Sequence, residues 1–303
     1  MKNSLLLPSV FLSTLLGATC HTQAEAAAPP AACVVIHHDE ARQSDGVTQK
    51  NIVASMPDGP SLHASEFHVA GVASGEQASE LGDAASVLLL TAIAAHHADA
   101  CSDWLKNEGE AAKTALASGH NPSFKWSHLT INNQKLKITA SSASFLLTRH
   151  DQGKARGEVA LADVVVDGAN APKLLPQAAK ATFSLPEDEI AALTQAVGGR
   201  STAAPVAHVT IETLTARRDD ITLSGNGTAN LTGSPDSATA SGHMEITNLN
   251  NLVSLAREEH QTKLATGLMI ASLVSHKNNG IQSWDVAWKS GILTVNHLPI
   301  PLH

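Results

Sequence analysis

The 303-residue chain is poor in aromatic residues, contains no tyrosine and has no run of basic side chains. Aromatic residues make up 3% of the sequence, so it offers few of the stacking surfaces on which sugars and bases are commonly bound. A nucleic-acid-binding surface needs clustered Lys and Arg, whereas the formal net charge here is -8. The composition therefore argues against nucleic acid as a partner and against a carbohydrate-binding module.

The common catalytic motifs are also missing. The sequence contains no Gly-x-Ser-x-Gly, His-Glu-x-x-His, Walker or Cys-x-x-Cys motif. The densest group of titratable residues, His37-His38-Asp39-Glu40, follows a predicted strand and is more typical of a solvated strand exit than of an acid/base or metal site. We expect a protein that is not an enzyme and needs no cofactor, with a hydrolase acting through His37 or His38 as the weaker alternative.

The N-terminus has the order of segments found in export signals. Lys2 is the only charge before an apolar run from Leu5 to Leu16, and small residues ending in Ala24-Glu25-Ala26 follow. About 12 apolar residues are too few to cross a bilayer, which needs about 20, but they fit a cleavable signal peptide. We therefore predict that residues 1-26 are removed, which leaves a soluble periplasmic protein with no retained transmembrane segment.

The three cysteines are expected to have different fates. Cys20 lies in the predicted signal peptide, and its use as a lipoprotein anchor is the weaker alternative because the preceding residues fit a lipidation site poorly. The other pair, Cys33 and Cys101, is expected to form a disulfide in an oxidising periplasm. Alternatively, Cys33 with His37 and His97 with Cys101 are two pairs at a spacing of four, which could together bind zinc. Such pairs arise by chance among 16 histidines, so the disulfide is preferred.

The first part of the mature chain predicts strands followed by a long helix. The apolar run from Cys33 to His37 is typical of a strand. Ser74 precedes Gln77 by three residues, as in a helix N-cap, and apolar residues then recur at helical spacing. We predict one helix that bends at Gly109, ends at Gly119 and covers a sheet with its apolar stripe.

After Pro122 the apolar residues alternate with a period of two. Trp126 to Ile131 and Lys135 to Ala140, joined by Asn132-Asn133, form a predicted hairpin. Further predicted strands are residues 144–148, 158–166 and 181–185, and a short helix is expected after Pro186 and before Gly198-Gly199.

The clearest alternation follows Pro205, where two successive strands have one small, apolar face and one polar face. We predict that the apolar face lines a ligand groove. The alternative is that its small residues only allow helices to pack closely, which would give a dry core and a structural or assembly-partner protein. The predicted groove residues are Leu223, Gly225, Gly227, Ala229, Leu231, Ala240, Gly242, Met244 and Ile246.

A second long helix, capped by Asn250 or Asn251 and ending at Asn278-Asn279-Gly280, is expected before a closing hairpin. The hairpin contains the pattern Gly291-x-Leu293-x-Val295-Asn296-x-x-Pro299-Ile300. Over residues 124–302 the meander, helix and hairpin together resemble the AsmA-like envelope proteins, in particular their periplasmic relatives of unknown function. The resemblance implies long twisted antiparallel sheets that form an apolar groove or half-barrel able to accommodate lipid. It implies no catalytic residue.

These patterns together predict an α+β fold, in which a long antiparallel β-meander is packed by two longer helices and one short helix. Residues 27–122 contribute the first strands and a long helix, and residues 123–303 contribute the meander, the C-terminal helix and the hairpin, in one continuous domain. The expected function is that of an exported, non-enzymatic envelope protein that binds a lipid or other amphipath. The expected partners are lipid or another envelope protein.

Overall fold

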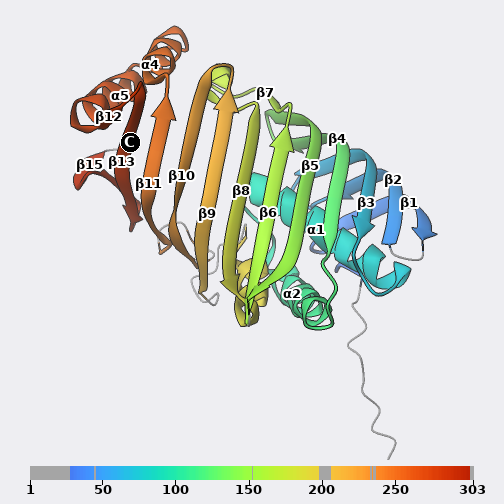
Figure 1. The fold of residues 1–303 in the computed structure, drawn as a ribbon. Helices are drawn as coiled ribbons and strands as arrows, with labels where there is room; N and C mark the ends of the chain where they lie inside the picture. The colour runs from blue at the N-terminus through green and yellow to red at the C-terminus, as the bar shows by residue number, and fades with distance from the viewer. Residues whose placement is uncertain are drawn as a thin grey trace, which may run out of the picture.

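A single antiparallel sheet runs through the protein from residue 35 to residue 300 (Figure 1). The computed structural model describes residues 28–43, 46–151, 153–197, 206–232, 234 and 237–300. The predicted signal peptide, its Cys20 and the expected helix end at Gly198-Gly199 lie outside these residues. Within them, no helix is both long and apolar enough to cross a membrane.

The sheet has fifteen strands, and almost every strand pairs with its neighbour in the sequence. Two short strands lie off this path: β7 pairs with β5, and β12 pairs with β13, so that β6 pairs with β8 and β11 pairs with β13. The strands are β1 (Val35–Gln43), β2 (Gly46–Ser55), β3 (Ser61–Ala70), β4 (Ser123–Asn133), β5 (Leu136–Asp151), β6 (Lys154–Ala162), β7 (Val165–Asp167), β8 (Ala178–Pro186), β9 (Ala207–Arg218), β10 (Ile221–Leu231), β11 (Thr239–Thr247), β12 (His276–Asn278), β13 (Ile281–Lys289), β14 (Ile292–Val295) and β15 (Leu298–Ile300).

The described residues form five α-helices: α1 (Gly75–Ala94), α2 (Ser102–Ala117), α3 (Ile190–Ala196), α4 (Leu249–Glu258) and α5 (Thr262–Val274). Short 3₁₀-helices lie at Asp99–Cys101, Pro172–Leu174 and Glu187–Glu189. The predicted α+β class and antiparallel meander are confirmed. The predicted number of helices is wrong, because each of the two long helices is two helices in the structure.

The first long helix begins where the sequence predicts and then breaks. Ser74 Oγ accepts a hydrogen bond from the Gln77 amide at 3.2 Å, so the predicted cap is confirmed. The chain leaves the helix at Ala95, which has a left-handed backbone with φ of 53°. The 3₁₀-helix Asp99–Cys101 then leads into α2, and Cys101 is bonded to Cys33, which lies just before β1. Ala is the strongest helix former, so no local signal marks this break.

The second long helix breaks in the same way. His260, with φ of 59°, separates α4 from α5, and the Gln261 amide donates to Ala256 O at 2.7 Å. Asn248, rather than Asn250 or Asn251, stands at the N-cap. The side chain of Asn251 donates instead to Asp220 Oδ2 at 2.7 Å, which holds the start of the helix against the turn before β10.

The strand predictions also need four corrections. Residues 136–140 and 144–148 belong to one 16-residue strand, β5, and Lys135 lies in the turn before it. The last returning segment divides into β14 and β15 at Asn296 and His297, which both have positive φ values. Strand β9 is not among the predicted strands, and residues 276–278 form β12 rather than the end of a helix.

One face of the sheet is apolar over most of its length. Side chains of residues paired directly across neighbouring strands point to the same face. One such row runs from β3 to β13 through Val69, Phe124, Phe145, Val159, Ala181, Leu214, Gly225, Met244 and Trp284.

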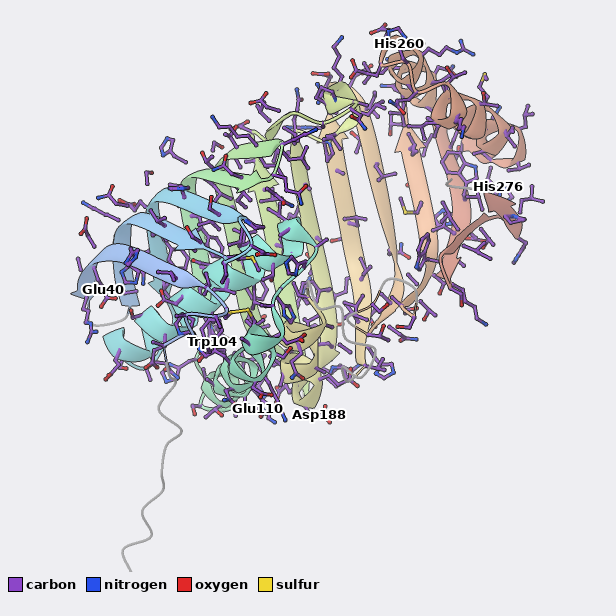
Figure 2. The ribbon with its side chains drawn as sticks, turned by 180° about the vertical axis from the view of Figure 1, so that it is seen from behind. Glu40, Trp104, Glu110, Asp188, His260 and His276 are labelled. Atoms are coloured by element: carbon purple, nitrogen blue, oxygen red, sulfur yellow. A yellow bond between two sulfur atoms is a disulfide. The ribbon has the colours of Figure 1, made fainter. Side chains whose placement is uncertain are left out.

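Two groups of helices cover this face at opposite ends of the sheet (Figure 2). In the N-terminal half, a β-carbon on Gly82 of α1 would lie 3.0 Å from the side chain of Val69. At the other end, Trp284 Nε1 donates to Ala271 O of α5 at 2.7 Å. Because Val69 and Trp284 belong to the same row, both helix groups lie on one side of the sheet, and the buried clusters lie beneath them.

Candidate functional site

An apolar cavity lies between helices α1 to α3 and the covered face of the sheet. Its volume is about 420 Å³, within the range of about 300–1,000 Å³ that is usual for small-molecule sites. The three helices line one side, and strands β4, β5, β6, β8 and β9, with Leu231 of β10, line the other. Among the described residues that line it, only Glu108, Ser144 and Thr194 are polar.

The sheet side of the cavity is built from the row that crosses the strands. Phe124, Phe145, Val159, Ala181 and Leu214 are successive partners on β4, β5, β6, β8 and β9, and all five line the cavity. Since they come from five strands, the cavity wall exists only when this part of the sheet has formed.

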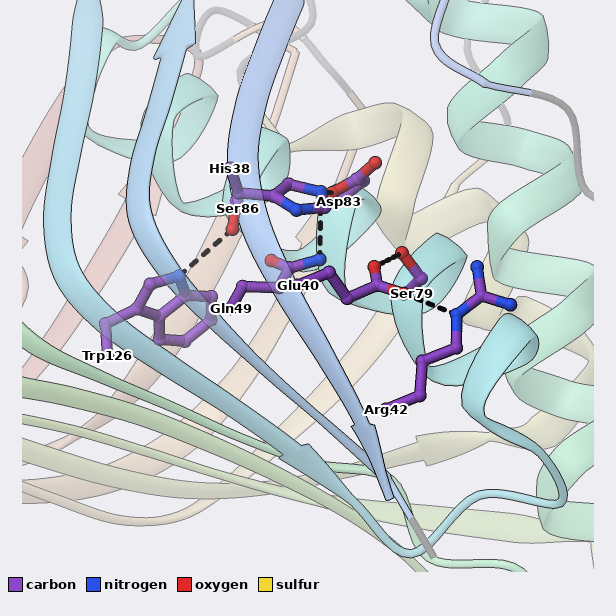
Figure 3. Close-up of polar contacts among 8 residues, drawn as sticks. All are labelled: His38, Glu40, Arg42, Gln49, Ser79, Asp83, Ser86 and Trp126. Carbon is purple, nitrogen blue, oxygen red and sulfur yellow. Dashed lines mark hydrogen bonds and ion pairs between the residues drawn. The ribbon is translucent and has the colours of Figure 1, made fainter. Parts of the chain in front are cut away.

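The scarce aromatic residues gather at this wall. The chain has five Phe and four Trp, of which Phe124, Phe145, Phe183 and Trp126 line the cavity. The rings of Phe124 and Phe145 stack with centroids 5.9 Å apart. Trp126 donates its indole N–H to Ser86 Oγ at 3.0 Å, so its polar atom is satisfied away from any ligand (Figure 3). Aromatic residues therefore present only apolar ring surface to the cavity.

Gly157 shapes the same wall. Gly157 of β6 pairs with Phe183 of β8, and a β-carbon on Gly157 would lie 2.4 Å from the phenyl ring. The ring of Phe183 therefore lies over Gly157. A side chain on any other residue at position 157 would clash with the ring in this position.

Helix α1 lines the side of the cavity opposite the sheet with the apolar face that the sequence predicts. Leu81, Ala85, Leu88 and Ala92, at helical spacing, all line the cavity. The prediction that this stripe covers a sheet is confirmed. Since two of the four are alanines, the helix leaves space above the wall rather than filling it.

Helix α3 is fixed against α2 at one side of the cavity. Thr194 Oγ1 donates to Leu105 O at 2.8 Å, and Gln195 Nε2 donates to Ser102 O at 3.3 Å. The first of these bonds satisfies the hydroxyl of Thr194, one of the three polar lining residues. The hydroxyl hydrogen of Thr194 is therefore already used within the protein, so Thr194 cannot donate it to a ligand without losing this bond.

Glu108 of α2 is the exception in this apolar site. The residue is 3% exposed, and neither of its carboxyl oxygens has a hydrogen-bond partner among the described residues. Burial, with smaller contributions from the negative charges of Glu80 and Asp83, raises the pKa of Glu108 to about 8. The carboxyl is therefore protonated near neutral pH, with one O–H donor and an acceptor oxygen to offer.

The predicted groove residues pair with one another beside the cavity. Leu223, Gly225, Gly227 and Ala229 of β10 are the direct partners of Ile246, Met244, Gly242 and Ala240 of β11. They share the apolar face and lie beyond β9, towards the C-terminal helices. Leu231 is the only one of the nine that lines the cavity.

Strand β9 was missed because its alternation is interrupted. Its cavity-lining residues are Val209, Ile211 and Leu214, and the last two are three positions apart. The register shifts on both sides of β9 at this point. A bulge of this kind breaks a period-two pattern, so the sequence alone gives a weak signal.

Cys33 and Cys101 form the predicted disulfide. This uses both thiols of the alternative zinc site. His97 is buried with its ring nitrogens next to Ala98 O and Gln195 O, while His37 is exposed on β1. Among the residues that the structure describes, no three His, Cys, Asp or Glu side chains are grouped so that they could hold a metal ion.

The His37 to Glu40 segment lies within the edge strand β1, where it fastens the strand to α1 (Figure 3). His38 Nε2 lies 3.2 Å from Asp83 Oδ1, and Glu40 accepts a short hydrogen bond from Ser79. The hydrogen bond to Asp83 raises the pKa of His38 above its ordinary value, despite the opposing effect of burial. The interpretation of the segment as a solvated strand exit is therefore wrong for His38 and Glu40.

Comparison with protein-family models, with curated proteins and with solved structures finds no match to this chain.

Proposed function

We propose that this protein binds the aliphatic chain of a lipid or other amphipath in the cavity between α1 to α3 and the sheet. The supporting observation is a volume of about 420 Å³ with an almost wholly apolar lining. Each methylene moved from water into such a site contributes about 0.8 kcal/mol. Eight buried methylenes therefore contribute about 6 kcal/mol, before the loss of ligand freedom is counted.

A dry core is the competing interpretation, and the size of the cavity weighs against it. A water molecule occupies about 30 Å³ of the liquid, and natural interiors contain few voids larger than that. The cavity is partly open, so solvent can reach it, yet its lining offers water few hydrogen bonds. An apolar occupant replaces this poorly bonded water on the apolar lining.

We also propose that the protein is exported and acts, without catalysis, in the periplasm as an AsmA-like envelope protein. The Cys33–Cys101 disulfide supports an oxidising compartment. Mass spectrometry of the mature N-terminus tests how the protein is exported and processed, because cleavage of the signal peptide predicts a start near Ala27. A diacylated Cys20 would instead establish the lipoprotein.

The binding proposal is tested with N-phenyl-1-naphthylamine, an uncharged apolar dye that fluoresces in dry sites. We expect saturable fluorescence with purified protein, and displacement by aliphatic amphipaths. Native mass spectrometry of protein gently purified from a periplasmic extract is expected to show a bound lipid mass. Protein that is lipid-free and also fails to bind the dye would support the dry-core, assembly-partner alternative.

A further inference from the structure

The buried carboxyl of Glu108 indicates which kind of polar end group the ligand has. We propose, building on the chain-binding function above, that the preferred occupant is a single-chain amphipath whose end is an uncharged hydroxyl or primary amide. This end exchanges hydrogen bonds with the Glu108 carboxyl inside the cavity.

The first support is the isolation of Glu108. It lines the cavity and is 97% buried, and both its oxygens are unpartnered within the described part of the chain. A buried polar group without a hydrogen bond costs about 1–3 kcal/mol, so natural proteins rarely keep one without a reason. Thr194 donates its hydroxyl hydrogen to Leu105 O, and Ser144 is the only other polar residue among the described residues of the lining. A ligand atom is therefore the natural partner for Glu108.

The second support is the match of donors and acceptors. A protonated carboxyl offers one O–H and one free carbonyl oxygen. A hydroxyl or primary amide can accept from the first and donate to the second, which satisfies both oxygens of Glu108 at once. An ester or a ketone could only accept, and would leave the carbonyl oxygen unpaired.

The charges around Glu108 disfavour a ligand with an ionised end group. Glu80 and Asp83 of α1 act on Glu108 with the same negative sign, so a carboxylate or phosphate end group would meet like charges. An alkylammonium end group would require Glu108 to ionise in the apolar site, and both ions would lose their hydration. The attraction within a buried ion pair often fails to repay that cost.

The test uses four ligands with the same ten-carbon chain: 1-decanol, decanamide, decanoate and decylamine. Each is titrated against the protein with bound N-phenyl-1-naphthylamine at about pH 6.5, where Glu108 is protonated and the last two ligands are charged. We expect decanol and decanamide to displace the dye at about tenfold lower concentrations than the charged ligands. The variant Glu108→Leu should bind the dye normally but need about fivefold more decanol, the effect of about one hydrogen bond. Glu108→Gln keeps a donor and an acceptor and should retain the preference.

The outcomes separate this inference from the function on which it rests. If wild-type protein does not bind the dye, chain binding itself is wrong and this inference falls with it. If the dye binds and the four ligands displace it equally, or Glu108→Leu keeps the preference for decanol, only the role of Glu108 is overturned. Tightest displacement by decylamine would likewise overturn it in favour of an ion pair with an ionised Glu108.

Discussion

Gly109 of α2 lies directly against Ala191 of α3, and a β-carbon on the glycine would come within 2.6 Å of the Ala191 Cα atom. The same β-carbon would lie 2.7 Å from Thr194 Oγ1. The two helices are therefore in backbone contact at the side of the cavity. Gly109 lies within the continuous helix α2, where the lack of a side chain allows α3 to approach closely.

Gly109→Ala should separate these helices. The added methyl group meets backbone rather than a flexible side chain, so we expect a loss of about 1–3 kcal/mol in the free energy of unfolding, measured by urea denaturation. Gly267→Ala is the matched control, because a β-carbon there meets nothing within 4 Å in helix α5. That variant should be as stable as wild type or up to about 1 kcal/mol more stable. Equal effects at the two positions would contradict the close contact.

The disulfide should contribute substantially to stability. Cys33 and Cys101 are 68 residues apart, and closing a loop of this length in the unfolded chain corresponds to about 4 kcal/mol. The double variant Cys33→Ala, Cys101→Ala should therefore unfold at lower urea concentration than oxidised wild type. A reductant should lower the stability of wild type to nearly that of the variant and leave the variant unaffected. A reductant-insensitive wild type would show that the bond is absent from the purified protein.

Local signals in the sequence predict the local structure well. The Ser74 cap, the end of α2 just before Gly119 and the alternation on β10 and β11 each depend on residues close together in the chain, and each is present in the structure. The helix breaks at Ala95 and His260 carry no such signal. Both are left-handed positions without glycine. The first is followed by Cys101, whose disulfide to Cys33 constrains the chain after the break.

The cavity could not be predicted in the same way. Its wall is built from five strands, and the pairing register between these strands cannot be deduced from the sequence of any one of them. Glu108 was missed for a related reason: a glutamate in a helix is normally read as solvent-facing. A signal was nevertheless present. Leu105, Glu108 and Ala112 follow the three- and four-residue spacing of one helical face, and Leu105 is fully buried. A charged residue on an apolar helical face indicates a buried carboxyl.

The pKa of Glu108 makes stability depend on pH in a defined direction. The folded protein holds the carboxyl proton up to about pH 8, whereas the unfolded chain releases it near the ordinary value of 4.5. Between these values the folded state binds more protons, so stability falls as pH rises, by at most about 1.4 kcal/mol per pH unit. Glu108→Gln cannot titrate, and we expect it to exceed wild type in stability by several kcal/mol at pH 8 but not at pH 4. Parallel curves of unfolding free energy against pH would contradict the shift.

His38 should add a separate dependence. Its pKa is raised by the hydrogen bond to Asp83, so the stabilisation from the charged imidazole is complete below 6.5 and is lost as pH rises through the folded value above it. His38→Gln should therefore lose most stability relative to wild type at pH 5 to 6, and less at higher pH. The NMR titration of the His38 ring measures the shift directly. A midpoint at or below 6.5 would rule out this contribution.

Filling the cavity should abolish ligand binding without unfolding the protein. Ala181 lines the sheet wall between its partners Val159 and Leu214, and Ala181→Leu would place three more carbons in the cavity. We expect dye affinity to fall at least about tenfold, while stability stays equal or rises by up to about 2 kcal/mol, as cavity-filling changes often do.

Ala216→Leu is the matched control for this change. Ala216 lies on the same apolar face of β9, opposite Leu223, but does not line the cavity. The same substitution there should leave dye binding unchanged. If instead Ala216→Leu weakens dye binding and Ala181→Leu does not, the ligand lies on the face of β10 and β11 that the sequence predicts as a groove. Because both variants carry the same added side chain, the comparison locates the ligand independently of any general effect on packing.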